Sequence, residues 1–240
     1  VDLSRRHPMA RPVTFISHCP ECGAPLVRSE GEAAWYCPND TGCPPQIRGK
    51  IEHFISRKAR NIEGIGSETV ALLHGSGLVH QVADLYDLTA EQLIPLERMG
   101  EKSAARILNS LENSRNVPFE RVLYALGIRY AGETVARILA RTAGTIDRLM
   151  TMTPEELTAI PEIGERIAAS VAGYFRDPRH LEIINRLREK SLRFESTDDG
   201  ATPASDKLRG MTIVISGTFT HHSREELKAL ITRHGAKNAG

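Results

Sequence analysis

Long hydrophobic runs are missing from this sequence of 240 residues, whose longest unbroken apolar run is about five residues. A membrane-spanning helix needs about 20 apolar residues, so no segment is long enough to cross a bilayer. The first residues also lack an apolar signal core, and they begin with Val1 instead of Met. We therefore expect a cytoplasmic segment of a longer chain, or a chain whose start has been trimmed.

The sequence also has almost no excess of charge of one sign and few aromatic residues. The 31 basic and 30 acidic residues leave a formal net charge of +1. This balance excludes a strongly basic tail but allows local basic patches. Aromatic residues make up only 5% of the sequence, which argues against a platform that stacks the bases of a single strand.

Cysteine is absent outside a short segment, where four occur with the spacing Cys19-x2-Cys22-x14-Cys37-x5-Cys43. The sequence Cys-Pro-Glu-Cys-Gly is typical of a tight turn that aims two thiolates at one ion, and four thiolates suit tetrahedral Zn²⁺. Because four protein ligands leave no position open for water, the predicted zinc site is structural. The alternatives are two disulfides, free thiols, or His18 as a ligand in place of one cysteine.

A glycine hairpin recurs four times in the rest of the chain. The segment "NIEGIG", which ends at Gly66, matches segments that end at Gly100, Gly132 and Gly164, with spacings of 34, 32 and 32 residues. Each copy has an aliphatic residue four positions before this glycine, and small or aliphatic residues follow in the next helix. Because internal repeats define an architecture, the sequence predicts four units of helix, hairpin and helix.

Each hairpin glycine lets the first backbone N–H groups of the next helix point outward together, which makes an anion site helped by the helix dipole. A DNA phosphate fits there, so the contact positions the duplex without reading its bases. Only the first copy has the full Gly-x-Gly, since Arg98, Tyr130 and Glu162 replace the earlier glycine. Two alternatives stay open: some copies, the third above all, only pack helices, or Gly64-Ile65-Gly66 binds a dinucleotide.

Basic residues add to this predicted interface. Lys102 and Arg166 each follow a hairpin glycine by two positions, and the segment 46–60 holds the strongest basic patch in the chain. For any one residue of that patch, plain solvation is an equal alternative. The predicted DNA-binding residues are Gly64, Ile65, Gly66, Ser67, Arg98, Gly100, Lys102, Gly132, Gly164, Arg166, Arg57, Lys58 and Arg60.

The sequence predicts a mainly α fold in five parts. Residues 1–15 form a linker, 16–47 a four-cysteine zinc finger, and 48–192 the domain of four hairpin repeats. A polar linker over 193–207 follows. Residues 208–240 then contain one buried strand and one helix, which cannot bury a core alone and predict an incomplete α/β domain.

This order of parts resembles the C-terminal half of bacterial NAD-dependent DNA ligases, a family with helix-hairpin-helix motifs. The match lies in "CPECGAPLVR", "YCPNDTGCPPQIRGKIEHFISRKARNIEGIGSETV" and "GIRYAGETVARILA". The segment "MTIVISGTF", with the helix after it, resembles the start of a BRCT domain. The resemblance implies that an OB-fold domain precedes residue 1 in the family.

The resemblance also implies an enzyme that seals nicks in duplex DNA during replication and repair. In that family NAD⁺ adenylates a lysine with Mg²⁺, AMP passes to the 5′-phosphate, and the 3′-hydroxyl closes the nick. The adenylation motif Lys-x-Asp-Gly is absent from these 240 residues, so no catalytic residue is predicted and the fragment alone should be inactive.

The predicted partner is nicked double-stranded DNA, bound by a monomer at the bacterial nucleoid without an obligate protein partner. Two alternative functions remain. One is a DNA-binding or scaffold segment of another DNA-repair protein with no ligase activity. The other is a helical repeat that binds proteins, an alternative that the net charge near zero favours.

Overall fold

The computed structural model describes residues 9, 15–28, 31–196, 205, 207–217, 219, 222 and 224–239. The contacts divide the chain into two compact units. Unit 1 comprises Val1–Arg115, Ala125–Gly127 and Asp177–Lys190, and unit 2 comprises Asn116–Tyr124, Ile128–Arg176 and Ser191–Gly240. The described residues are mainly helical, which confirms the predicted fold class. Among them, no helix is long and apolar enough to span a membrane.

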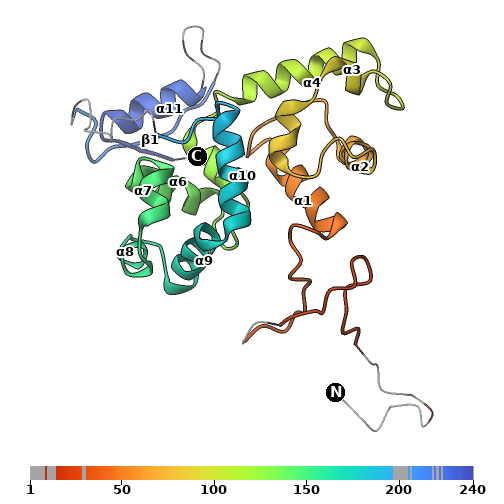
Figure 1. Ribbon diagram of the computed structural model, residues 1–240. Helices are drawn as coiled ribbons and strands as arrows, with labels where there is room; N and C mark the ends of the chain where they lie inside the picture. Colours follow the sequence, from red (N-terminus) through yellow and green to blue (C-terminus); the bar gives the residue numbers. More distant parts are fainter. Residues whose placement is uncertain are drawn as a thin grey trace. The chain divides into compact units, whose positions relative to one another are not determined.

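Unit 1 begins with the cysteine segment, and its first helix starts directly after Cys43. Proline in the first turn suits this start, because a helix leaves its first N–H groups without internal partners. The helix α1 buries Ile51, Phe54 and Ile55 and packs on α2. The helices of unit 1 (Figure 1) are α1 (Pro44–Ile55), α2 (Ser67–Gly75), the 3₁₀ helix η2 (Val82–Asp87), α3 (Ala90–Leu93), α4 (Glu101–Ser114) and α10 (Pro178–Glu189).

A buried cation lies in the core of unit 1. Arg60 has no exposed surface, and its guanidinium carbon lies 5.9 Å from the ring centroid of Phe54. Its Nη2 donates a hydrogen bond to the carbonyl of Ser114 at the end of α4. Phe54 in turn meets Tyr86 edge to face, with ring centroids 6.3 Å apart. Arg60 therefore joins the chain after α1 to the end of α4.

Unit 2 contains a compact group of helices, of which α6 to α9 are seen together in Figure 1. Threonine side chains cap two short helices, since Thr145 accepts from the N–H of Arg148 and Thr153 accepts from the N–H of Glu156. The helices are α5 (Phe119–Ala125, whose last residue is assigned to unit 1), α6 (Glu133–Ala143), α7 (Ile146–Thr151), α8 (Pro154–Thr158) and α9 (Glu165–Arg176).

The end of the chain forms a β–α–β unit. The strand β1 (Thr212–Ile213) pairs in parallel with β2 (Lys237–Asn238), and α11 (Arg224–Arg233) lies between them in sequence. Parallel strands need such a crossover. The predicted strand and helix are present, but the strand is not buried as predicted, because Thr212 is exposed, Ile213 is half-buried and Val214 is 66% exposed. The assignment to a BRCT domain stays a prediction. Most of the predicted linkers 1–15 and 193–207 lies outside the described residues.

The four hairpins share one left-handed position. The residue two positions before the repeat glycine has a left-handed φ in every copy, with +87° at Gly64, +60° at Arg98, +66° at Tyr130 and +70° at Glu162. Left-handed backbone costs a residue with a side chain about 1–2 kcal/mol. The last three copies therefore keep the left-handed position without the glycine that suits it best.

This strain predicts a stabilising substitution. Arg98→Gly should raise the urea midpoint of unfolding by the equivalent of about 0.5–1 kcal/mol, because the relieved strain exceeds the extra entropy of glycine in the unfolded chain. The exposed ion pair of Arg98 with Glu68, 4.0 Å apart, adds almost nothing to stability. The control is Ala105→Gly on the exposed face of α4, which should lower the midpoint by a similar amount. A lower midpoint for Arg98→Gly would contradict the strain.

Candidate metal centre and nucleic-acid interface

The four cysteine sulfur atoms lie within 4.8 Å of one another. The Sγ atoms of Cys19 and Cys43 are 3.8 Å apart, and those of Cys22 and Cys37 are 3.5 Å apart. Sulfur atoms bound at about 2.3 Å to one tetrahedral Zn²⁺ are about 3.8 Å apart. The cysteines are therefore unlinked thiols whose arrangement fits a closed four-sulfur zinc site, and the disulfide alternative is not what the structure shows.

Short backbone turns position these sulfur atoms. The N–H of Gly23 donates to the carbonyl of Cys19 at 2.8 Å, and Gly23 has a φ of +71° that favours glycine. The N–H of Cys43 donates to the carbonyl of Asn39, which closes the second turn at 3.0 Å. Gln46 of α1 holds this turn from outside, because its Nε2 donates to the carbonyl of Cys37 at 2.9 Å.

The pKa values of the thiols differ with their surroundings. A hydrogen bond from the backbone of Ala24 lowers the pKa of Cys22 to about 7. Burial raises the pKa of Cys43, whose side chain is 2% exposed. A bound divalent cation would supply the positive charge that a buried thiolate needs.

Two exposed side chains lie near the cysteines in sequence. The Nδ1 of His18 lies 3.0 Å from Oγ of Ser17, and among the described residues the cluster of possible metal ligands contains only the four cysteines. Trp35 is 53% exposed and lies against Arg28, whose guanidinium carbon is 5.5 Å from the ring centroid.

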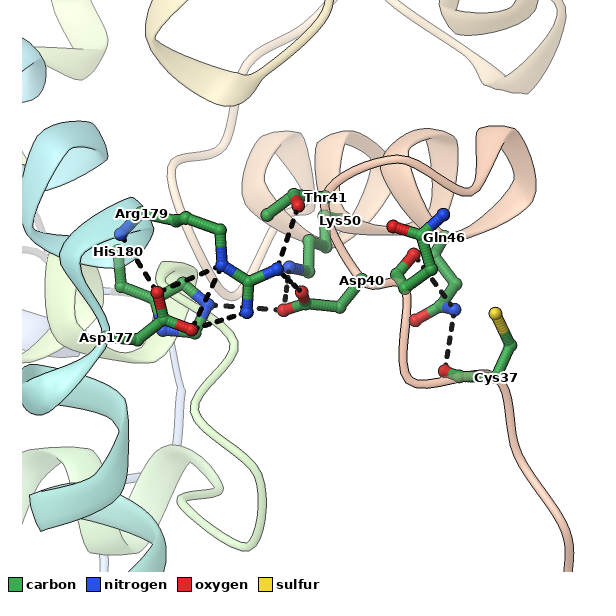
Figure 2. Close-up of polar contacts among 9 residues, drawn as sticks. Cys37, Asp40, Thr41, Gln46, Lys50, Asp177, Arg179 and His180 are labelled. Carbon is green, nitrogen blue, oxygen red and sulfur yellow. Dashed lines mark hydrogen bonds and ion pairs between the residues drawn. The ribbon is translucent and has the colours of Figure 1, made fainter. Parts of the chain in front are cut away.

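A charged network attaches the second cysteine turn to two helices of unit 1 (Figure 2). The carboxylate of Asp40 accepts from Lys50 of α1 at 2.7 Å, and it lies 3.2 Å from His180 Nε2 at the start of α10. Arg179 lies between Asp40 and Asp177, at 3.4 Å and 2.5 Å, and it also donates to Thr41 Oγ1 at 3.1 Å. The network therefore holds the cysteine segment against the start of α10.

These contacts shift the pKa values of both carboxyl groups. The hydrogen bond from His180, followed by that from Lys50, holds the pKa of Asp40 well below its usual range. The hydrogen bond from Arg179 lowers the pKa of Asp177 to about 2. Asp177 also caps α10, because its Oδ1 accepts from the N–H of Arg179 at 2.9 Å.

The hairpin glycines stand at the starts of four helices and leave them without a side-chain cap. The carbonyls of Gly66, Gly100, Gly132 and Gly164 accept the first helical bonds at 2.9–3.0 Å. The N–H groups before that bond have no partner within an α-helix, and glycine has no side chain to accept from them. By contrast, the helices α7, α8 and α10 receive caps from Thr145, Thr153 and Asp177. The hairpin helices therefore present unsatisfied donors together with the positive end of the helix dipole.

The first and second hairpins lie against each other within unit 1. The N–H of Glu63 donates to Ser110 Oγ at 2.7 Å, and Arg106 Nη2 pairs with the Glu63 carboxylate at 3.0 Å. A Cβ on Gly64 would lie 3.0 Å from Ile107 Cγ1. Position 64 therefore favours glycine for two reasons, its left-handed φ and its close approach to α4.

The third and fourth hairpins are joined in a similar way within unit 2. Ser170 Oγ of α9 donates to the carbonyl of Arg129 at 2.7 Å. Arg166 Nη2 donates to the hydroxyl of Tyr130 at 2.6 Å. The two pairs are therefore built alike. In the first pair α4 binds Glu63, which precedes the left-handed Gly64, and in the second pair α9 binds Arg129, which precedes the left-handed Tyr130. These contacts are not visible in the sequence pattern.

Most of the predicted DNA-binding residues lie on the surface. The exposed set is Gly64, Gly66, Ser67, Arg98, Gly100, Lys102, Gly132, Gly164, Arg166, Arg57 and Lys58. Ile65 is buried at 7% exposure, so only its backbone remains available. Arg60 is a correction, because its buried guanidinium bonds Ser114 and cannot reach a ligand on the surface. It follows Arg57 and Lys58 in sequence, and nothing in that local charge pattern shows that the chain turns it inward.

Sequence reasoning missed the network around Asp40. One signal was available: the second cysteine pair has five residues between its ligands, more than the two to four of common zinc ribbons. The longer turn carries Asp40 and Thr41 outward to Arg179. The partners on α10 lie nearly 140 residues away in sequence, so no local pattern indicates them.

Comparison with known proteins gives three family matches. Residues 18–44 match the NAD-dependent DNA ligase C4 zinc finger domain. Residues 56–113 match the SAM-like helix-hairpin-helix tandem, and residues 121–184 match the helix-hairpin-helix motif. The fold and the cysteine cluster thus define a helix-hairpin-helix protein with a four-cysteine zinc finger.

The whole chain is also similar to curated proteins named DNA ligase. It is 53% identical over 240 residues to that of Phocaeicola vulgatus and 52% identical over 240 residues to that of Bacteroides fragilis. It is 55% identical over 232 residues, 97% of the chain, to that of Parabacteroides distasonis. The chain spans 36%, 36% and 35% of the lengths of these relatives. It is therefore a homologue of a region of bacterial DNA ligases, and its zinc finger is of the NAD-dependent kind.

The sulfur cluster predicts the effect of losing one ligand. Cys37→Ser should remove the metal and unfold the cysteine segment, because structural zinc supplies much of the folding free energy of such small modules. Metal content and limited proteolysis of residues 15–43 measure this loss. The control is His18→Ala, which should retain the metal because His18 lies outside the cluster. Four thiols that react freely in the folded, metal-loaded protein would contradict the site.

The network predicts a second effect on stability. Asp40→Asn should lower the urea midpoint by the equivalent of about 1–2 kcal/mol at pH 7, because Lys50, Arg179 and the ring of His180 lose a half-buried carboxylate. Since folding lowers the pKa of Asp40, this stabilisation is present above a pH of about 4 and is lost as the pH falls further.

The control for this change is Glu63→Gln, which removes an exposed pair with Arg106 and should leave the midpoint almost unchanged. Hydrogen exchange at the start of α10 should increase in Asp40→Asn and not in Glu63→Gln. Equal midpoints for both variants would contradict the role of Asp40.

Proposed function

We propose that the chain is the DNA-gripping part of an NAD-dependent DNA ligase that seals single-strand nicks in duplex DNA. The observation that carries the proposal is the left-handed position that the four hairpins share, each followed by a helix that begins directly after a glycine. Homology to DNA ligases along the whole chain supports it.

The ligand of the hairpins would be the sugar–phosphate backbone. Outward N–H groups at a helix start bind a phosphate oxygen by charge-assisted hydrogen bonds, without regard to base sequence. The exposed cations Lys102 and Arg166 follow two of the glycines, and Arg57 and Lys58 add charge in unit 1. Because the net charge is only +1, this grip depends on local positive sites and not on a general attraction.

The hairpin pairs suit the two strands of a duplex. The first and second hairpins contact each other in unit 1, as do the third and fourth in unit 2. A pair of phosphate sites held at a fixed separation can hold two phosphates across a groove. We infer that each pair acts as one clamp, so that the partner is double-stranded DNA that contains a nick, bound by a monomer in the bacterial cytoplasm.

In this proposal Cys19, Cys22, Cys37 and Cys43 hold a structural Zn²⁺. Four thiolates fill the coordination sphere, so the metal orders the segment and takes no part in the reaction. NAD⁺ and Mg²⁺ serve adenylation, which needs a lysine in a motif that these 240 residues do not contain. The chain would therefore bind nicked DNA without sealing it.

A salt titration tests the proposal. The affinity of the zinc-loaded chain for a nicked duplex, measured by fluorescence anisotropy, should fall steeply and linearly on a plot of log K against log salt concentration. Phosphate contacts by cations set this slope. Affinity without a salt slope would rule out a phosphate grip and favour a protein-binding helical repeat.

Two hairpin variants make the prediction specific. Gly66→Val should weaken binding about tenfold without changing the salt slope, since the side chain covers backbone donors and removes no charge. Its fold should persist, because a Cβ at Gly66 meets no atom within 4 Å. Lys102→Gln should instead lower the slope by about one. The control is Gly64→Ala, which should lower the urea midpoint because of its φ and its contact with Ile107.

A further inference from the structure

One short loop, residues 38–42, joins the candidate metal centre to a helix that lies nearly 140 residues later in sequence. Both ends of the loop adjoin candidate ligands, because Cys37 precedes it and Cys43 follows it. A metal bound by both sulfur atoms would fix the two ends relative to each other, and the loop would lose conformational freedom. The order of the loop therefore depends in part on the metal.

The loop contacts the first turn of α10 (Figure 2). Asp40 Oδ2 lies 3.2 Å from His180 Nε2, and Asp40 Oδ1 lies 3.4 Å from Arg179 Nη1. Arg179 Nη1 also donates to Thr41 Oγ1 at 3.1 Å. On the side of α1, Lys50 donates to Asp40 Oδ2 at 2.7 Å. The loop thus connects α1 with α10, and all of these residues belong to unit 1.

The side chain of Arg179 is also held by its own helix. Asp177, the cap of α10, accepts hydrogen bonds from Arg179 Nε at 3.0 Å and from Arg179 Nη2 at 2.5 Å. Because a guanidinium group is planar, a group that is fixed on one side presents its remaining nitrogen at a defined position. Contact between Nη1 and the loop therefore requires little further ordering of this side chain.

The two halves of α10 are attached to unit 1 in different ways. Within this fully described helix the buried side chains are those of Ile184 and Leu187, both in its second half. The second half also pairs with η2, since Arg186 Nη1 lies 2.8 Å from Asp84 Oδ1. The attachment of the first half therefore depends more on polar contacts, and the 38–42 loop supplies such contacts.

We propose that metal binding at the four cysteines and the attachment of the start of α10 are coupled through Asp40 and Arg179. The inference rests on the proposed zinc site and gives the metal a second role, because a loop that the metal orders holds α10 in place. Asp40 and Arg179 are positioning residues, since the described cluster of possible ligands contains only the cysteines. Coupling is reciprocal, so a contact that the metal strengthens must in turn strengthen metal binding.

The coupling would extend the effect of the metal beyond the cysteine segment. The chain leaves unit 2 at Arg176, the end of α9, and enters unit 1 at Asp177. Loss of the metal would therefore loosen unit 1 at the residue where the chain from α9 joins it. The cysteine segment would act as a metal-dependent clasp on α10.

The first measurement is the affinity of the reduced 240-residue chain for Zn²⁺, in competition with a chromophoric chelator. Arg179→Gln should weaken Zn²⁺ binding about fivefold to twentyfold, although residue 179 is not a ligand. The matched control is Arg186→Gln, the same substitution in the second half of α10, where the partners are Asp84 and Asp87. This control should change the affinity by less than about twofold.

The second measurement is hydrogen exchange of α10 with and without Zn²⁺. Removal of the metal should speed exchange at residues 180–183 about tenfold, while exchange at residues 186–189 should remain nearly unchanged. In Arg179→Gln the residues 180–183 should exchange fast in both states, because the link to the loop is already lost. Exchange at 180–183 that does not respond to the metal would overturn the inference.

The outcomes separate the inference from the proposed metal site. If the unchanged chain binds no Zn²⁺, the site fails and the inference fails with it. If the chain binds Zn²⁺ and Arg179→Gln keeps the affinity, the site stands and the coupling is wrong. If the metal-free chain unfolds as a whole, the comparison with Arg186→Gln decides, because a general loss of stability lowers the affinity of both variants alike. Equal losses in the two variants would therefore also overturn the coupling.

Discussion

The structure depends on one backbone constraint, the left-handed residue two positions before each hairpin glycine. With this residue at a φ between +60° and +87°, the chain turns so that the next helix begins directly after the glycine. Glycine provides no side-chain cap, so the first N–H groups of that helix remain available to a ligand. The same turn brings Gly64 within reach of Ile107, and it brings Tyr130 within reach of Arg166. The start of the helix and the pairing of the hairpins thus both depend on this left-handed position.

Three copies keep this conformation without the residue that suits it best. Arg98, Tyr130 and Glu162 bear the cost of a left-handed backbone, about 1–2 kcal/mol each. In two of them the side chain contacts the partner hairpin, Arg98 through Glu68 and Tyr130 through Arg166. Backbone strain that persists at an exposed turn is typical of a functional site. In these three hairpins the strained residue carries a side chain where the first hairpin has glycine.

The sequence predicted what is periodic or closely spaced. Four cysteines within 25 residues indicated one metal site, and recurrence at Gly66, Gly100, Gly132 and Gly164 indicated the hairpins and their helices. What it missed depends on contacts between distant segments. Arg60 belongs to a basic run that predicts an exposed position, yet the turn after α1 buries it against the end of α4. Asp40 and Arg179 are in contact although they belong to distant segments of the sequence, and a local charge pattern carries no information on such pairs.

The two kinds of site require different environments, which explains their separate places in the chain. A closed sulfur site depends on burial and on turns that are held rigid, so Asp40 and Gln46 attach it to α10 and α1. A surface that binds phosphate must stay exposed, and only charges close to the ligand add to its affinity. In a chain with a net charge of +1, the proposed binding of phosphate would therefore depend on the few cations next to the hairpins. Cations that are held in place before binding would lose less of the interaction with an anion to ordering.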